Sequence, residues 1–328
     1  MTVRQNETGT TIGIDLGGTK IYALAVDDGR IVGESKEKTP VHGGPLAVVD
    51  ALASVVRQLT PETPAAVGVG APGAIDHQSG VIRWAPNLPG WIEPFNLASA
   101  LSAALSDCPV LIDNDVNVGT LAEHRLGAGQ GHEDLVGIFV GTGVGGGLIL
   151  DGKLRRGPSG FAGEIGHMVV RTGGRRCGCG GRGHVEAYAG RAGMERRARQ
   201  LADRGSDTVL VSLAKARRMT SSVFARALAA KDAVALNLVE GAVEALAQAL
   251  AATVTVLDVP LVVIGGGLAD RLGPSFVARI EAATAELVPG VQTGALRIVP
   301  GDLGDRGGAL GAALMAGTDI SLTGSVPP

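Results

Sequence analysis

Residues 12–26, IGIDLGGTKIYALAV, and residues 135–150, LVGIFVGTGVGGGLIL, follow the same plan. Each begins with a short apolar run, passes through a turn of glycine and threonine, and returns as a second apolar run, which predicts two strands joined by a tight hairpin. Glycines with bare N–H groups and a threonine hydroxyl suit the close approach of phosphate oxygens. Two such hairpins in one chain predict two related lobes, each presenting a turn to the phosphates of a nucleotide.

These turns differ from the common nucleotide-binding loops. The first lacks the following helix and the Gly-Lys-Ser/Thr ending of a Walker A loop. Gly141 to Gly147 satisfies G-x-G-x-x-G, but a strand follows, so the dinucleotide-binding context fails. Asp15, two residues before the first glycine pair, suits the metal ion that accompanies a nucleotide. A third glycine run, residues 265–267, would let the backbone approach a flat ligand such as adenine, although a tight strand-to-helix connection explains it equally well.

Residues 160–186, GFAGEIGHMVVRTGGRRCGCGGRGHVE, concentrate metal ligands. Cys177 and Cys179 are one residue apart and His184 follows five residues later, so zinc is the expected occupant. His167 precedes an apolar run, residues 168–170, that is predicted as a strand, and it could fold back to complete a Cys2His2 set. The alternative is a buried or disulfide-bonded cysteine pair, but this spacing rarely has disulfide geometry. A metal here would hold a loop in shape so that Glu164 and Glu186 can bind a polar small molecule.

A second polar cluster, DNDVN at residues 113–117, follows an apolar strand and precedes a helix. A protein core would not tolerate this cluster without a ligand or full pairing. One carboxylate could accept a proton from a substrate hydroxyl, while Asp113 or Asn117 is expected to cap the helix. The turn at residues 71–74 ends another buried strand, at the kind of edge where α/β sheets bind ligands. Asn87 could bind a hydroxyl or simply form a turn.

The composition narrows the class of protein. A chain of 328 residues suits two domains, and a formal net charge of -3 with a pI near 6.1 gives no reason to expect a nucleic-acid partner. Three cysteines, two of them in the metal-like stretch, fit a reducing cytoplasm. The polar first residues do not resemble a signal peptide. Glu244 and Gln248 interrupt the apolar stretch 242–257, so a buried helix is expected rather than a membrane span. Residues 187–204 are predicted as one arginine-rich helix with a solvated face, a role near phosphate being the alternative.

Together these motifs resemble the ROK family of sugar kinases, within the actin-like ATPase superfamily. DLGGTK, APNLPGW, DNDVN, GTGVGGG, GEIGH, CGCGGRGHVE and GGGLA occur in the family's order over roughly residues 12–270. The resemblance implies an α/β actin-like ATPase (ribonuclease H-like) fold with two α/β lobes around a central cleft. We expect a small domain at 1–117, completed by a C-terminal helix at about 305–328, and a large domain with the zinc loop at 118–304. The resemblance also suggests a homodimer.

The resemblance further implies phosphorylation of a hexose with ATP and Mg²⁺, supported by structural Zn²⁺. Glucose, converted to glucose 6-phosphate, is the first choice; N-acetylglucosamine, N-acetylmannosamine and fructose are the alternatives, and polyphosphate is an alternative donor. Asp115 matches the general base. His167, Cys177 and Cys179 match zinc ligands, and His184 stands where the family usually has a third cysteine. The expected sugar-binding residues are Gly73, Asn87, Asn114, Asp115, Glu164, His167 and Glu186. The expected ATP-binding residues are Asp15, Gly17, Gly18, Thr19, Lys20, Gly141, Thr142, Gly143, Gly265, Gly266 and Gly267.

Two other functions compete with this expectation. A sugar-responsive repressor of the same family would carry an N-terminal helix-turn-helix, and the fourteen residues before Asp15 are too few for one. A non-catalytic sugar-binding regulator or actin-like scaffold would have no need of the acidic and amide cluster at residues 113–117. The family's usual Ala-Ser-Gly near Tyr188 is Ala189-Gly190-Arg191 here, a departure with no predicted effect.

Overall fold

The structure, a computed structural model, describes residues 9–88, 90–290 and 294–317. Residues 1–8 and 318–328, at the outer ends of the predicted small domain, lie outside the described residues, as does Pro89 of the APNLPGW motif. Contacts divide the chain into two units: the first holds residues up to 131, 153–162 and those from 305 onward, and the second holds 132–152 and 163–304. A boundary after residue 117 would cut the helix Asp115–Leu126, which packs as a whole within the first unit.

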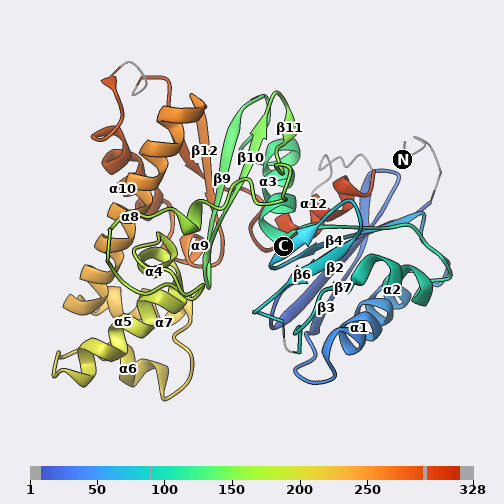
Figure 1. The fold of residues 1–328 in the computed structure, drawn as a ribbon, viewed down its shortest axis with the longest axis horizontal. Helices are drawn as coiled ribbons and strands as arrows, with labels where there is room; N and C mark the ends of the chain where they lie inside the picture. The colour runs from blue at the N-terminus through green and yellow to red at the C-terminus, as the bar shows by residue number, and fades with distance from the viewer. Residues whose placement is uncertain (1–8, 89, 291–293, 318–328) are drawn as a thin grey trace. The chain divides into compact units, whose positions relative to one another are not determined.

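The first unit is built on a five-stranded mixed sheet in the order β3-β2-β1-β4-β8 (Figure 1). β1 is antiparallel to β2 and parallel to β4, and β4 is parallel to β8. A small antiparallel sheet, β5-β6-β7, accompanies it. The elements are β1 (Thr11–Leu16), β2 (Lys20–Asp27), β3 (Arg30–Lys38), α1 (Gly44–Leu59), β4 (Ala66–Ala71), β5 (Ala74–Asp76), β6 (Val81–Trp84), β7 (Phe95–Asn96), α2 (Leu97–Ala104), β8 (Val110–Asn114), α3 (Asp115–Leu126), η2 (Gly304–Arg306) and α12 (Gly307–Met315).

The two faces of this sheet differ because side chains alternate along a strand. Ile12 and Ile14 of β1 are fully buried in the core that includes α1. On the other face, Gly13 and Gly68 leave the backbone bare: a Cβ there would lie 2.0 Å from the Ala309 carbonyl oxygen and 1.9 Å from that of Ala312. α12 therefore rests directly on the backbone of β1 and β4, as the red helix beside β4 in Figure 1 shows.

The second unit repeats the sheet of the first. Its strands run in the order β11-β10-β9-β12-β13, with β9 antiparallel to β10 and parallel to β12, which is parallel to β13. The order matches that of β3-β2-β1-β4-β8, and the directions of β10, β9, β12 and β13 match those of β2, β1, β4 and β8, so the predicted duplication is confirmed. The strands of the second unit are β9 (Leu135–Val140), β10 (Val144–Leu150), β12 (Leu261–Gly265) and β13 (Arg297–Pro300), and the short edge strand β11 (Lys153–Leu154) belongs to the segment 153–162 of the first unit.

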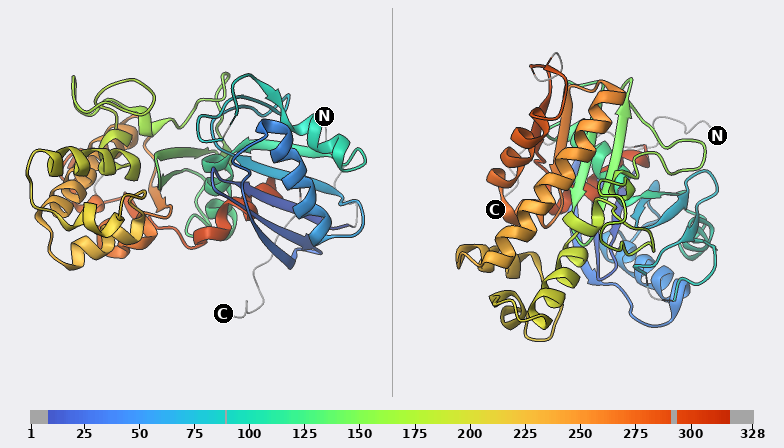
Figure 2. Two further views of the ribbon diagram at one scale, coloured as in Figure 1. Left: turned by 90° about the horizontal axis from the view of Figure 1, so that it is seen from below. Right: turned by 60° about the vertical axis from the view of Figure 1, so that its left-hand side comes forward.

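Helices supply most of the second unit's core. α8 is long and apolar enough to span a membrane by length and composition alone, but most of it is buried inside this unit, as predicted for residues 242–257. Figure 2 shows α8 and α10 running side by side, and both contribute to the core. The helices are η1 (Ile165–His167), α4 (Glu186–Ala189), α5 (Arg191–Asp203), α6 (Val209–Ala214), α7 (Ser221–Ala229), α8 (Ala233–Leu257), α9 (Ala269–Leu272) and α10 (Pro274–Ala285).

Two local predictions in this unit are wrong. The helix predicted over 187–204 is interrupted at Gly190, whose extended backbone (φ -68°, ψ 132°) separates α4 from α5. The strand predicted at 168–170 does not form among the described residues, where Val169 makes one isolated bridge, to His184. The preceding segment instead packs through glycine onto β10: a Cβ on Gly166 would lie 1.9 Å from the Val144 carbonyl oxygen. That packing fixes η1 in place of a longer strand.

Candidate active site

The first unit gathers its predicted site residues at the carboxyl ends of three parallel strands. Asp15 of β1 pairs in register with Gly70 of β4, and Ala71 of β4 pairs with Asn114 of β8. Gly73 follows β4 and accepts a hydrogen bond of 3.2 Å from Asn114 Nδ2 through its carbonyl oxygen. Parallel strands bring their carboxyl ends to one edge, which is where open α/β sheets bind ligands.

The first glycine turn is braced from both sides. Gly17 N–H donates to the Lys20 carbonyl oxygen at 2.9 Å, and Thr39 Oγ1 donates to the Gly17 carbonyl oxygen at 2.6 Å. Gly18 is packed so closely against Asn87 that a Cβ would lie 2.6 Å from the Asn87 carbonyl oxygen. Among the described residues, the N–H groups of Gly18 and Thr19 have no hydrogen-bond partner. The turn can therefore offer adjacent donors to an anion.

Asn114 caps α3, a role that the sequence analysis gave to Asp113 or Asn117. Its Oδ1 accepts from the backbone N–H of Val116 at 2.9 Å and of Asn117 at 3.3 Å. That assignment was wrong because β8 continues through Asn114, so the helix begins one residue later, at Asp115. Asp115 lies in the first turn of α3 and its Oδ1 accepts from Val116 N–H at 2.9 Å. A carboxylate at this position is stabilised by the N-terminal end of the helix dipole.

Asp113 and Asn117 form a buried bracket behind Asn114 and Asp115. Asp113 Oδ1 accepts from Asn117 Nδ2 at 3.0 Å and from Asn114 N–H at 2.7 Å. Its Oδ2 pairs with Arg156 Nε at 2.5 Å, and the Asp113 side chain is only 3% exposed. Full pairing, one of the two conditions that this polar cluster was expected to meet, is satisfied for Asp113 by Arg156, which no sequence pattern singled out.

Asp15 carries the most perturbed carboxyl group of this edge. Burial, reinforced by the negative charge of Asp115, raises the pKa of Asp15 to about 7, and Lys20 opposes that shift. Lys20 itself pairs with Asp305 at 3.0 Å. Two carboxylates held close in a buried setting disfavour each other's charge, and such a pair attracts a cation.

In the second unit, two glycine runs lie side by side at the carboxyl edge of the sheet. Gly141 N–H donates to the Gly143 carbonyl oxygen at 2.9 Å, while the N–H groups of Thr142 and Gly143 have no partner among the described residues. The run 265–267 follows β12, and a Cβ on Gly266 would lie 2.7 Å from Val140 N, at the start of the turn. Like the first turn, the second turn therefore presents N–H groups without partners among the described residues, and it lies next to the glycine backbone of residues 265–267.

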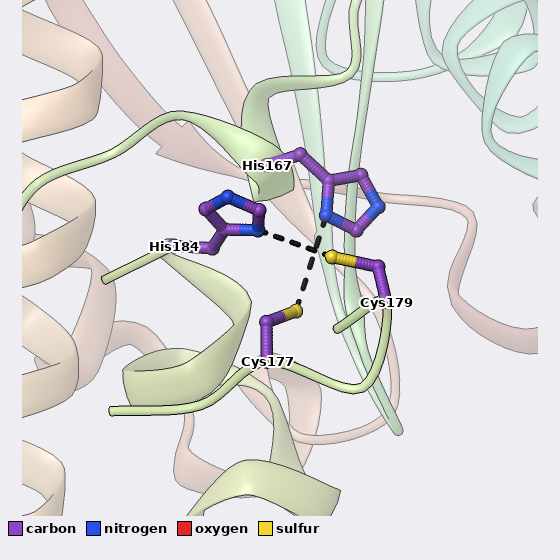
Figure 3. A group of neighbouring side chains, drawn as sticks. All are labelled: His167, Cys177, Cys179 and His184. Atoms are coloured by element: carbon purple, nitrogen blue, oxygen red, sulfur yellow. Dashed lines mark hydrogen bonds between the residues drawn. The ribbon is translucent and has the colours of Figure 1, made fainter. Parts of the chain in front are cut away.

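The four predicted zinc ligands converge on one point (Figure 3). The ligand atoms of His167, Cys177, Cys179 and His184 all lie within 4.8 Å of one another. His167 Nδ1 is 4.0 Å from Cys177 Sγ, and His184 Nδ1 is 3.3 Å from Cys179 Sγ. Two sulfurs and two imidazole nitrogens at these separations fit the tetrahedral ligand set that zinc prefers. Cys177 and Cys179 are free thiols in the structure, which does not contain the disulfide bond considered as an alternative for this pair.

The two glutamates of this stretch lie beside the cluster. Glu164 Oε2 is 3.7 Å from His167 Nε2, and burial is the main cause that raises the pKa of Glu164, with Glu186 adding to it and His167 opposing it. Glu186 Oε1 lies 3.3 Å from Cys177 Sγ, while its Oε2 accepts from Val144 N–H at 3.2 Å. Glu186 therefore joins the cysteine loop to the second glycine turn.

Each unit thus brings its own predicted site residues together. The first edge holds Asp15, Gly17, Gly18, Thr19, Lys20, Gly73, Asn87, Asn114 and Asp115. The second unit gathers Gly141, Thr142, Gly143, Glu164, His167, Cys177, Cys179, His184, Glu186 and the run 265–267. The sequence analysis missed Arg156, Asp305 and Arg191 as site residues, although two signals pointed to Arg191: the arginine-rich character of residues 187–204, and the departure from the family's Ala-Ser-Gly at Ala189-Gly190-Arg191.

Comparison with known proteins agrees with this arrangement. The model of the ROK family matches residues 11–319. A glucokinase of Thermotoga maritima is 32% identical over 305 residues, 92% of this chain and 95% of the relative. A kanosamine kinase of Amycolatopsis mediterranei is 34% identical, covering 96% of this chain and 98% of the relative. The crystal structure of a ROK family glucokinase from Streptomyces griseus in complex with glucose and AMPPNP matches with a TM-score of 0.80 and 33% identity, over 94% and 99% of the two chains.

Two sheets of one order, each ending at a glycine turn, define the actin-like ATPase fold, and the predicted fold class is confirmed by the matching structures. Within that class, the chain belongs to the ROK family.

Proposed function

We propose that glucose is the substrate of this ATP-dependent sugar kinase and that glucose 6-phosphate is its product. The observation that carries the phosphoryl transfer itself is the position of Asp115, at the first turn of α3 on the carboxyl edge that also holds Asp15. The Thermotoga maritima relative is a glucokinase, which supports glucose as the first choice. The kanosamine kinase supports keeping other hexoses as alternatives.

Asp115 is the proposed general base. Its carboxylate accepts the proton of the attacking sugar hydroxyl while that oxygen forms a bond to the γ-phosphorus and ADP leaves. The backbone N–H of Val116 donates to one carboxylate oxygen, Oδ1, at 2.9 Å and so orients the side chain of the base. The bracket of Asp113 and Asn117 behind it fixes the start of the helix. A base held in this way loses little freedom when the substrate binds.

The phosphates of ATP would meet the two glycine turns, whose free N–H groups and threonine hydroxyls suit them. Asp15 would help to position Mg²⁺, and the positive charge of the ion would favour the charged form of its buried carboxylate. A divalent cation, when bound, neutralises charge on the β- and γ-phosphates. Lys20, paired with Asp305, adds a cation to the same edge. We assign the run 265–267 to the adenosine part of the nucleotide because its backbone is open.

Sugar hydroxyls would be bound by groups that both donate and accept hydrogen bonds. Asn114 Nδ2 uses one of its two hydrogens on Gly73, which leaves one for a hydroxyl. Asn87, Glu164, His167 and Glu186 complete the proposed set. His167 would serve twice: Nδ1 faces the cysteines, and Nε2 faces Glu164.

The cluster of His167, Cys177, Cys179 and His184 would hold structural Zn²⁺. A bound zinc ion would fix the loop between Cys177 and His184, because a tetrahedral site would join His167 to three ligands of that loop. Glu186 would then be held against both the loop and the second glycine turn. We also propose a cytoplasmic homodimer, in keeping with the free thiols; light scattering on the purified protein tests the dimer.

ADP release from ATP and Mg²⁺, measured against a panel of hexoses, tests the function. The panel contains glucose, fructose, N-acetylglucosamine, N-acetylmannosamine and a 3-amino sugar. We expect turnover to be highest with glucose and to fall at least about 100-fold in Asp115→Asn, the range for loss of a general base. Melting curves of both proteins provide the control for folding.

Higher turnover with another sugar of the panel would replace glucose but keep the kinase. Near-normal turnover in Asp115→Asn would remove Asp115 from the role of base. No turnover with any sugar, in protein that is folded and zinc-loaded, would favour a sugar-binding regulator.

A further inference from the structure

Arg191 lies against the second glycine turn, at the point where Gly190 separates α4 from α5. Its backbone N–H donates to the Gly141 carbonyl oxygen at 3.1 Å. Its guanidinium donates through Nη2 to Thr142 Oγ1 at 2.7 Å and through Nη1 to the Met219 carbonyl oxygen at 2.7 Å. Both the main chain and the side chain therefore fix this arginine on the turn.

The guanidinium keeps donors to spare. An arginine has five N–H donors, and two of them are used here, on Thr142 and Met219. Among the described residues, the others have no partner, and neither do the N–H groups of Thr142 and Gly143. A forked cation beside free backbone donors is the arrangement that binds phosphate oxygens.

The surroundings of Arg191 favour an anion. Glu195, a carboxylate that acts on the charge of Arg191, is already bound by Arg199 Nη2 at 2.8 Å and by Met219 N–H at 3.0 Å. Burial and the nearby positive charge of Arg218 lower the pKa of Arg191, while Glu195 raises it. Glu186 also lies at this turn, where its Oε2 accepts from Val144 N–H, so an anionic ligand would be bound by the guanidinium and by the N–H groups of Thr142 and Gly143.

We propose that Arg191 binds the phosphate chain of the phosphoryl donor at the Gly141–Gly143 turn and so determines the preference for donors with two or more phosphates. This inference rests on the proposed function, since it names a further residue of the same donor site. α5's own N-terminus takes no part, because the N–H groups of Arg191 and Ala192 are bonded to the carbonyl oxygens of Gly141 and Thr142. The guanidinium and the turn carry the binding.

Calorimetric titration of the full chain with ATP and with AMP, without sugar, tests the proposal. For Arg191→Gln we expect the Kd of ATP to rise about tenfold, as for loss of a hydrogen bond to a charged group. The Kd of AMP should change less than about twofold, since AMP lacks the outer phosphates and its binding also reports a folded site. Arg191→Lys should fall between, because lysine keeps the charge and loses the fork.

Arg196→Gln is the matched control: Arg196 is exposed and lies on the same helix, five residues from Arg191. Equal losses for ATP and AMP in Arg191→Gln, no loss for either, or the same loss in Arg196→Gln would overturn the proposal. If the unaltered protein binds ATP while these results occur, the proposed function survives without Arg191. If the unaltered protein binds neither nucleotide, both proposals fail. Repeating the titration with inorganic polyphosphate tells whether the chain recognised belongs to a nucleotide or to polyphosphate.

Discussion

Arg156→Met should destabilise the first unit by leaving a buried carboxylate without its cation. The Asp113 side chain is 3% exposed and that of Arg156 is 26% exposed. Removing one partner of a buried ion pair costs about 3–5 kcal/mol. The hydrogen bonds of Asp113 to Asn117 and to Asn114 N–H remain, and Arg156 is partly solvated, so we expect the lower end, about 3 kcal/mol. For a unit of this size that loss corresponds to roughly 6–12 °C in Tm.

Differential scanning calorimetry of the full chain measures this loss, and the sugar-kinase assay measures its effect on the neighbouring Asp115. Arg155→Met is the matched control, since Arg155 is exposed and adjacent in sequence. The double variant Asp113→Asn with Arg156→Met should recover much of the lost Tm, because the unpaired charge is gone. A shift of Arg156→Met no larger than that of Arg155→Met, or a double variant no more stable than Arg156→Met, would refute the reasoning.

Three further predictions concern other parts of the chain. The pKa of Asp15 in the folded protein, about 7, lies above its ordinary value of 3.8, so the stability that its protonated form contributes is lost as pH rises between these values. Without Mg²⁺, the Tm of Asp15→Asn should therefore rise relative to that of the unaltered protein from pH 4 to pH 8. A difference in Tm that stays constant over this range would contradict the prediction. Gly68→Ala places a Cβ 1.9 Å from a carbonyl oxygen of α12 and should lower the free energy of unfolding by at least about 3 kcal/mol. Gly241→Ala, in open space on α8, should raise it by about 1 kcal/mol. Chemical unfolding that gave the same change for both variants would contradict this. Cys179→Ser should lower the zinc content measured by mass spectrometry, and Cys108→Ser should not; equal zinc in both would remove Cys179 as a ligand.

The repeated sheet could be predicted from the sequence because its signals are local. Residues 12–26 and 135–150 carry their own strand and turn patterns, and the structure has strands there. The cysteine and histidine spacing likewise places ligands within one loop, and His167 joins them as expected. Asp232, directly before α8, is a residue type that commonly caps helices, and its side chain accepts from Ala235 N–H at 2.8 Å.

Features that depend on contacts between residues far apart in the sequence could not be predicted from local patterns. Arg156 meets Asp113 across 43 residues, and nothing in the residues around either one points to the other. Gly190 ends α4 because the chain there turns onto Gly141 and Thr142, a contact made only in the folded unit. The run 145–147 reads as part of a turn, but it lies in β10, where missing side chains let the segment before His167 pack closely.

The placement of α12 on β1 and β4 has a consequence for synthesis on the ribosome. These strands lie within the first 71 residues, but the helix that covers their glycine face begins at Gly307. At a synthesis rate of about 5–20 residues per second, roughly 10–50 s pass between the synthesis of these strands and that of the helix. The second unit needs nothing beyond residue 304, so its residues are all available before the first unit's last helix is made. The earliest strands of the nascent chain thus complete their packing last, and until then their bare backbone is open to chaperones and to other chains.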